Sequence, residues 1–235
     1  MMIGKEIHDI DVDMPKDVYD TGKEIPTFDA YLTIIVRDSK GKVIKVHRQR
    51  SHSPTANFIV LLLPFVYFQY NSSALNITNT GGSTYSIQLG NSSINTYITY
   101  PNPKYNSGQQ SALIMIQVGS GSQSNPYTAT ALAAPIANGS GTGQLIYGTP
   151  SVSSTITVSG SSAYFYISQA FNNQTSGTID ITEVGIITQI SLSNYAISTV
   201  TNCGNLLMWY DALSSAISVP AGGTVVVTYT FMVNP

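Results

Sequence analysis

Short runs of β-branched and aromatic residues alternate with clusters of Gly, Ser, Asn and Pro through most of the chain. The runs SALIMIQV, SAYFYISQAF and GTIDITEVGIIT are examples, and seven or more such runs have the length of a strand. In the run GGTVVVTYTFMV every second residue is apolar, namely Val225, Val227, Tyr229, Phe231 and Val233. This period of two indicates a strand with one buried face. Many short strands with turn signals between them predict a mainly β fold, an antiparallel β-sandwich that is jelly-roll-like.

Residues 30–50 contain two further β-rich runs on either side of the turn sequence DSKG. A polar turn of this kind between two such runs predicts a β-hairpin. The hairpin is basic, since six Lys or Arg and only one Asp occur between Arg37 and His52. Its candidate basic patch consists of Arg37, Lys42, Lys45, Arg48 and Arg50.

Two interpretations of the basic patch stay open. The patch can neutralise the acidic residues that precede it in the chain, or it can contact nucleic acid. The first interpretation is favoured, because runs of charge are usually solvated or paired and because no aromatic stacking residues interleave the basic ones in the sequence. Nucleic acid is therefore the less favoured partner.

An almost continuous apolar segment follows the hairpin. Ser53 suits a helix N-cap and Pro54 suits the first helical position, so the pattern predicts a helix from about Pro54 to Gln69. Pro64 should kink or split this helix, and a buried strand is the alternative. The segment has eleven consecutive residues of mostly apolar character, whereas a membrane-spanning helix needs about twenty.

The candidate assembly interface lies in this segment. Its side chains are large and apolar and cannot face water together. Two environments stay open for them, the core of the protein's own fold or the contact with a neighbouring subunit. The residues of this interface are Phe58, Leu61, Leu62, Phe65 and Phe68.

Ionisable groups are concentrated in the first 50 residues, with nine of ten Lys/Arg and nine of twelve Asp/Glu, and only Lys104, Asp180, Glu183 and Asp211 follow. Acid–base catalysis needs paired titratable groups in a cleft, yet residues three apart in a strand, such as Asp180 and Glu183, point to opposite faces.

The single Cys203 excludes an internal disulfide and a thiolate cluster. We therefore predict no enzyme activity and no catalytic, cofactor-binding or metal-binding residues. We also expect the β region to be nearly indifferent to acid.

Residues 1–29 hold eight Asp or Glu and three Lys, which is typical of an acidic arm that orders only on assembly. The stretch has no apolar core of a secretion signal, so we expect neither an export signal nor a transmembrane span. The pattern divides the chain into two regions. Residues 1–69 contain the arm, the hairpin and the apolar helix and form a docking region, and residues 70–235 form the β-sandwich.

Seven motifs follow one another between Ile116 and Phe231: IQVGSG, LAAPI, LIYGTPSVSS, AYFYISQAFNN, ITEVGI, LLMWYDAL and VPAGGTVVVTYTF. Their order, together with VRDSKGKVIKVHRQRSHS near the N-terminus, resembles a family of virion structural proteins from archaeal viruses and some tailed phages. The resemblance implies a β-sandwich without enzymatic activity that serves as an adaptor, nozzle, vertex or fibre-base subunit. The chain departs from that family at Gln169-Ala170 and Tyr210-Asp211, where its relatives tend to have arginines.

The expected function is that of a non-enzymatic structural subunit located in the virion. Its partners would be further copies of the same chain and other virion proteins. The alternative is a β-sandwich binding module that recognises carbohydrate on a host surface. Tyrosines such as Tyr97, Tyr100, Tyr105 and Tyr127 could stack on sugar rings in that case.

Overall fold

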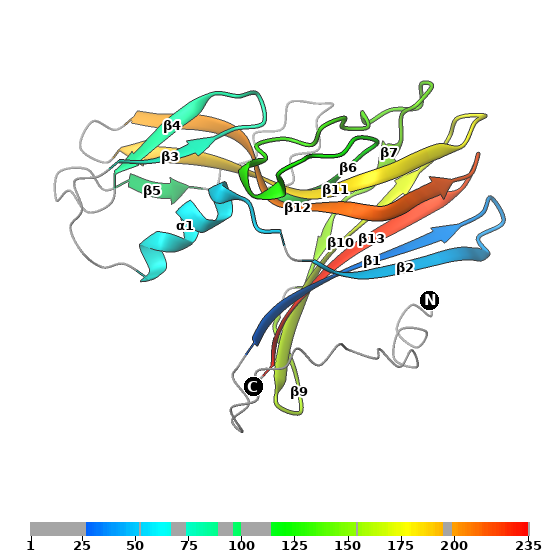
Figure 1. Ribbon diagram of the computed structural model, residues 1–235, viewed down its shortest axis with the longest axis horizontal. Helices are drawn as coiled ribbons and strands as arrows, with labels where there is room; N and C mark the ends of the chain where they lie inside the picture. The colour runs from blue at the N-terminus through cyan, green and yellow to red at the C-terminus, as the bar shows by residue number, and fades with distance from the viewer. Residues whose placement is uncertain are drawn as a thin grey trace.

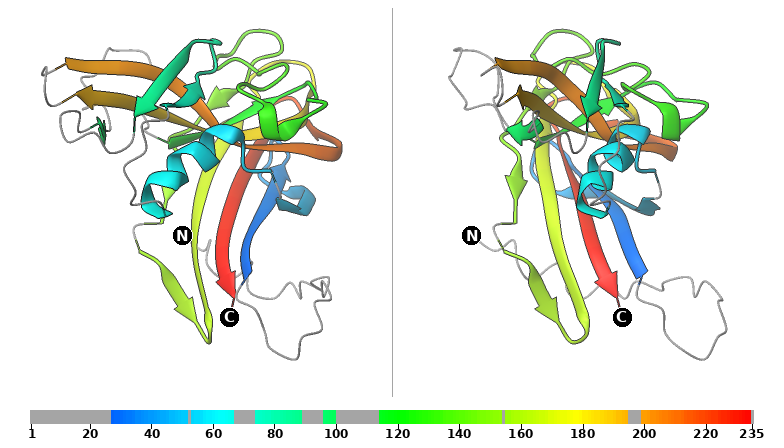
Figure 2. Two further views of the ribbon diagram at one scale, coloured as in Figure 1. Left: turned by 60° about the vertical axis from the view of Figure 1, so that its left-hand side comes forward. Right: turned by 90° about the vertical axis from the view of Figure 1, so that its left-hand side faces the viewer.

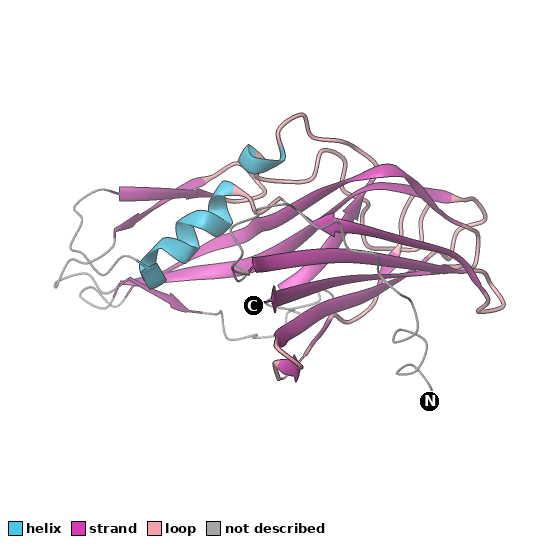
Figure 3. Cartoon of the chain, turned by 60° about the horizontal axis from the view of Figure 1, so that its bottom comes forward, coloured by secondary structure: helices cyan, strands magenta, loops and turns pink. Residues whose placement is uncertain are grey.

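The computed structural model describes residues 27–51, 53–66, 74–88, 96–99, 114–153, 155–194 and 199–234. These residues form antiparallel sheets with one α-helix, so the prediction of a mainly β fold is confirmed. The described residues contain one α-helix and one short 3-10 turn, and Figure 3 shows that strands dominate. The acidic arm, residues 1–29, was predicted to order only on assembly; residues 1–26 lie outside the described residues, and residues 27–29 form the start of β1.

The larger sheet, sheet A, has the strand order β2-β1-β13-β10, and three short strands pair with the far side of β10. The four long strands are β2 (Val43–Ser51), β1 (Thr27–Arg37), β13 (Thr224–Asn234) and β10 (Ser162–Asn172). The three short strands are β7 (Ile146–Tyr147), β8 (Ser151–Val152) and β9 (Thr157–Ser159). Strand β13 lies in the middle of the sheet, between β1 and β10.

The second sheet, sheet B, is formed around one long hairpin. Its strands are β11 (Ile179–Asn194), β12 (Thr199–Val219), β5 (Thr96–Thr99) and β6 (Ile114–Gly119). A separate hairpin consists of β3 (Ala74–Thr78) and β4 (Thr84–Gln88). It lies near the helix α1 (Ala56–Val66) at the far end of sheet B (Figure 1).

The main core lies where the two sheets face each other. Val225, Val227 and Tyr229 of β13 are fully buried there, as the alternation predicted, and their neighbours point to the other face. Burial of such apolar side chains is the main driving force for the sandwich. Val233 breaks the pattern, since it continues the alternation but remains 46% exposed.

The predicted hairpin is confirmed, with the DSKG turn between β1 and β2. Asp38 closes this turn, since its Oδ1 accepts hydrogen bonds from the backbone N–H groups of Lys40 and Lys42. The expectation that the hairpin lies outside the sandwich, in a separate region before it, is wrong. Strand β1 pairs with β13 along its whole length, and its side chains Leu32 and Ile34 are fully buried in the main core. The hairpin is part of the sandwich because its apolar alternation complements that of the C-terminal strand.

The predicted helix is shorter than expected at its start. It begins at Ala56, because Pro54 forms an isolated β-bridge with Trp209 and Thr55 donates its hydroxyl to the carbonyl of Leu207. These contacts tie the residues before the helix to β12. Pro64 lies inside α1, two residues before its end, and does not split it. Residues 67–69, which were predicted to continue the helix, lie outside the described residues.

The two sheets overlap over only part of their lengths. Figure 1 shows sheet B extending to one side, where its far end meets α1, β3 and β4. Sheet A extends in another direction, and Figure 2 shows β1, β13, β10 and β9 continuing past the edge of sheet B. Each sheet therefore has a covered half inside the sandwich and a half that extends beyond it.

Candidate assembly surface

A buried glutamate fixes the loop that follows β6. Glu183 of β11 is fully buried, and its carboxylate accepts backbone N–H groups from Gly121 at 3.2 Å, Ala133 at 3.0 Å and Ala134 at 2.7 Å. Three such hydrogen bonds satisfy a charge that would otherwise be costly to bury. We call this arrangement the Glu183 clasp.

Glycines allow the loop to approach the Glu183 clasp closely. A Cβ on Gly119 would overlap the Glu183 carboxylate, and a Cβ on Gly121 would lie 2.7 Å from the backbone nitrogen of Ala134. The loop also includes the 3-10 turn η1 (Pro126–Thr128). Of the motifs compared above, IQVGSG, LAAPI and ITEVGI therefore meet at one point and have a shared structural role.

Tyr210 of β12 adds a further contact to this loop. Its hydroxyl accepts the backbone N–H of Gln123 at 2.8 Å. Burial raises the pKa of the Tyr210 phenol, and the nearby Glu183 carboxylate raises it further. The phenol is therefore a neutral hydrogen-bonding group that holds the loop on the outer face of sheet B.

A second buried carboxylate joins the two sheets. Asp211 of β12 accepts hydrogen bonds from the Ser51 hydroxyl at 2.5 Å and from the Tyr229 hydroxyl at 2.8 Å. The Trp209 indole N–H donates to the same serine hydroxyl. Burial, followed by the negative charge of Asp211, raises the pKa of Tyr229 well above its usual range. Ser51 and Tyr229 belong to sheet A, so this cluster is a polar bridge across the sandwich.

Gln169 forms another bridge between the sheets. Its side-chain oxygen accepts the backbone N–H of Ile116 at 2.7 Å, and its amide nitrogen donates to the carbonyl of Gly148 at 2.9 Å. Gln169 and Asp211 both lie at positions where the chain differs from the virion-protein family that its motifs resemble. A neutral amide and a hydrogen-bonded carboxylate therefore connect the sheets at these two positions.

Two further ionisable groups of the sandwich, Asp180 and His47, are also engaged in local contacts. Asp180 accepts the Ser218 hydroxyl at 2.6 Å, and His47 shares a hydrogen bond of 2.9 Å with Gln49. Within the described ranges, no group of His, Cys, Asp and Glu side chains could hold a metal ion. Glu183 accepts hydrogen bonds from backbone groups of the loop after β6, whereas Asp211 accepts them from the side chains of Ser51 and Tyr229. The expected indifference of the β region to acid stays a prediction. It was based on the scarcity of ionisable groups there, and the sandwich contains the two buried carboxylates Glu183 and Asp211.

The candidate assembly interface on α1 is placed only in part. Phe58 packs edge-on against Trp209 with ring centroids 5.4 Å apart, and the buried Leu61 belongs to a cluster with Ile77, Cys203 and Leu206. These two side chains therefore contact the protein's own sheet. The side chains of Leu62 and Phe65, and the whole of Phe68, lie outside the described residues.

A different apolar surface is exposed on sheet A. Phe28, Val233, Ala163 and Val158 lie opposite one another on β1, β13, β10 and β9 and form one row across the sheet. Phe28 is 56% exposed, Val233 46% and Val158 71%. We call this row the apolar ledge. It continues the inner face of the sandwich past the point where sheet B covers it.

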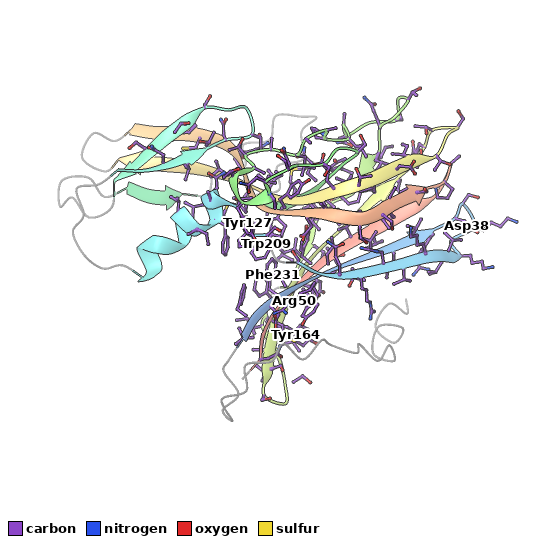
Figure 4. All side chains as sticks on the ribbon, viewed as in Figure 1. Asp38, Arg50, Tyr127, Tyr164, Trp209 and Phe231 are labelled. Atoms are coloured by element: carbon purple, nitrogen blue, oxygen red, sulfur yellow. The ribbon has the colours of Figure 1, made fainter. Side chains whose placement is uncertain are left out.

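The covered core ends immediately next to the ledge. Trp209 of sheet B packs edge-on against Phe231 at 5.2 Å, and Phe231 stacks on Phe28 at 6.1 Å and on Phe165 at 5.0 Å. Figure 4 shows Trp209 and Phe231 where the two sheets separate. The same aromatic cluster thus runs from the buried core into the exposed surface.

The structure separates the residues of the candidate basic patch. Arg50 forms an ion pair with Asp29, and Arg37 donates to the carbonyl of Gly41 at 3.1 Å. Lys45 points to the opposite side of β2 and donates to the carbonyl of Ala216 at 3.0 Å. The other two members of the patch are Arg48, which is partly buried on β2, and Lys42, which is exposed beside the turn. They do not form one continuous basic face.

The tyrosines considered for sugar binding are only partly placed. Tyr127 is 56% exposed in the turn η1. Its backbone N–H is held by the Asn125 side chain at 3.2 Å, so the turn presents the ring to solvent. The side chain of Tyr97, and the whole of Tyr100 and Tyr105, lie outside the described residues.

Comparisons of the chain with protein-family models, with curated protein sequences and with solved structures gave no significant match. Among the described residues, no helix is long and apolar enough to cross a lipid bilayer.

Neither the apolar ledge nor the burial of Asp211 was predicted from the sequence. Val233 and Phe28 continue the alternation of core strands, and nothing in the pattern marks where sheet B stops covering them. For the Glu183 clasp one signal is present, since an isolated glutamate within an apolar strand needs buried hydrogen-bond donors. The closely spaced glycines of IQVGSG could have been proposed as their source.

Proposed function

We propose that the chain is a non-enzymatic structural subunit of a virus particle, built on a jelly-roll-like sandwich. It assembles with further copies of itself and contacts other virion proteins, as an adaptor, nozzle, vertex or tail-associated component. The observation that carries this proposal is the apolar ledge, a row of exposed large side chains at the edge of a well-packed core.

The ledge favours a protein partner on energetic grounds. Full burial of a Val or Phe side chain contributes on the order of 1.5–3 kcal/mol. Phe28, Val158 and Val233 lie in one row, so a single partner can cover them together. Contiguous apolar surface of this kind is typical of subunit contacts. A neighbouring copy of the chain is the partner we propose.

The polar contacts support a structural role. Glu183 holds a loop, whereas Asp211 and Gln169 connect the sheets. These buried groups are engaged in hydrogen bonds that hold elements together, which suits a rigid building block. A subunit in which one patch meets a different patch on an identical neighbour assembles into a closed ring when the rotation closes.

Mass spectrometry of purified virus particles tests the location of the chain. We expect peptides from this chain at a fixed ratio to the major capsid protein, and we expect the ratio to stay constant through successive purification steps. Peptides found only in the lysate of infected cells would contradict the proposal. A glycan array on the purified chain separates the alternative function, since specific sugar binding would favour the host-recognition module.

A further inference from the structure

Strand β2 is an uncovered edge of sheet A. It pairs with β1 on one side, and no strand among the described residues pairs with its other side. Three apolar side chains of this strand are exposed, Val43 at 36%, Ile44 at 50% and Val46 at 46%. Natural sheets usually protect such an edge, because its free N–H and C=O groups and apolar side chains invite pairing with another strand.

The charge of β2 also lacks a match within the described part of the chain. Lys45 donates to a neutral backbone carbonyl, and the buried Nε of Arg48 has no hydrogen-bond partner there. The ion pair of Arg50 with Asp29 is the exception on this strand. The edge therefore favours a partner that is both apolar and acidic.

Residues 1–26, which precede β1, have this chemistry. They contain seven Asp or Glu and three Lys. Within them the sequence DIDVDM, residues 9–14, alternates strictly between aspartate and an apolar residue. In an extended strand this alternation puts the three aspartates on one face and Ile10, Val12 and Met14 on the other.

We propose that residues 9–14 add to the free edge of β2 as a further strand of sheet A. In this arrangement Ile10, Val12 and Met14 cover Val43, Ile44 and Val46, and the aspartates lie on the face of Lys45. Backbone hydrogen bonds to the edge supply affinity, and the matched apolar and charged faces set the register.

The connection is long enough for this docking. Twelve residues separate Met14 from Thr27, and when extended they span about 40 Å. A nine-residue strand such as β2 is about 30 Å long. The strand can therefore come from the same chain or from a neighbouring copy. The docking itself does not depend on the proposed function, but an exchanged arm would link the subunits of the proposed assembly.

Disulfide trapping in the full-length chain tests the contact. Val12→Cys combined with Val46→Cys should form a disulfide under mild oxidation, because both side chains lie on the same face of adjacent strands. Val12→Cys combined with Val152→Cys is the matched control, since Val152 is as exposed as Val46, at 46%, and lies on β8, on the opposite side of sheet A from the β2 edge. The native Cys203 is buried and should not interfere.

Two results of trapping would support the docking. A compact monomer on a non-reducing gel would show that the arm binds its own chain, and a ladder of oligomers would show arm exchange. A compact monomer would leave the docking intact while removing the arm as an intersubunit link. Trapping of the Val46 pair at no higher yield than the Val152 pair would overturn the proposal.

Hydrogen exchange provides a second test that needs no cysteine. The variant with Asp9→Asn, Asp11→Asn and Asp13→Asn keeps the size of the arm and removes its charge. We expect the edge amides of β2 to exchange about tenfold faster in this variant than in the wild-type chain, because opposite-charge cross-strand contacts are lost. The amides of β13 should be unchanged. Equal exchange of β2 in both chains would overturn the proposal, and salt-sensitive retention of DNA on a filter would then assign the basic residues to nucleic acid.

Discussion

The inner face of sheet A has two halves that are built from the same strands but differ in what covers them. In the covered half, Leu32 of β1 and Val227 of β13 are fully buried under sheet B. In the uncovered half, Phe28 and Val233 of the same two strands are 56% and 46% exposed. The alternation of apolar residues is the same in both halves. The alternation therefore specifies which face of sheet A is apolar, but not what packs against it. Sheet B packs against the first half, and in our proposal a partner protein packs against the second half.

The largest expected difference between the halves is in the cost of removing an apolar side chain. Leu32→Ala should lower the free energy of unfolding by about 2–5 kcal/mol, because it leaves a cavity in the core. Phe28→Ala should cost about 1 kcal/mol or less in the isolated chain, since it loses mainly a stacking contact. Urea denaturation of both variants measures the difference. Equal costs would mean that the two halves are equally covered.

Alkaline pH should destabilise the covered half through its buried tyrosines. Burial raises the pKa of Tyr147 from 10.0 to about 12. Below pH 10 the phenol is protonated in the folded and the unfolded chain. Between pH 10 and 12 only the unfolded chain loses the proton, so the free energy of unfolding falls as the pH rises. At 1.36 kcal/mol per pKa unit, the loss from this group is about 2–3 kcal/mol.

Thermal unfolding between pH 8 and pH 12 measures this effect. The Tyr147→Phe variant should show a shallower decline above pH 10 than the wild-type chain, although it loses the hydrogen bond to the Ile136 carbonyl at neutral pH. Tyr127→Phe is the control, because this tyrosine is exposed. An identical decline in the Tyr147→Phe variant and the wild-type chain would contradict the predicted linkage.

A smaller effect is expected from the Glu183 clasp on the outer face of sheet B. Glu183→Gln keeps the size of the side chain but puts an amide donor against backbone N–H groups. We expect it to cost about 1–3 kcal/mol and to speed hydrogen exchange in residues 120–135. Asp180→Asn is the matched control, since Asp180 is an exposed carboxylate on the same strand, and it should change stability by about 0.5 kcal/mol or less. Equal effects of the two variants would argue against the clasp.

Local patterns predicted much of this fold. The alternation of β13 and the DSKG turn of the hairpin depend on neighbouring residues, and both are confirmed. The predicted start of α1 at Pro54 was wrong because Pro54 and Thr55 contact β12, more than 150 residues away in the sequence. Propensity alone could not show that these tertiary contacts replace the first helical turn.

The candidate site was less predictable because it depends on contacts between distant parts of the chain. Glu183 accepts hydrogen bonds from backbone groups 49 to 62 residues before it. The ledge depends on where sheet B ends relative to sheet A, which no local pattern records. The basic patch illustrates the same limit, since the bulge between Val36 and Arg37 and the two faces of β2 separate residues that are close in the sequence.

Sedimentation velocity tests the central claim, that the uncovered half of sheet A is a contact between subunits, most directly. The wild-type chain should sediment as an oligomer, and Val158→Asp should dissociate it by placing a charge on the ledge. Thr157→Asp, which puts the same charge on the other face of β9, should leave the oligomer intact. A wild-type chain that stays monomeric at all concentrations, or a Val158→Asp variant that assembles like the wild-type chain, would contradict the claim.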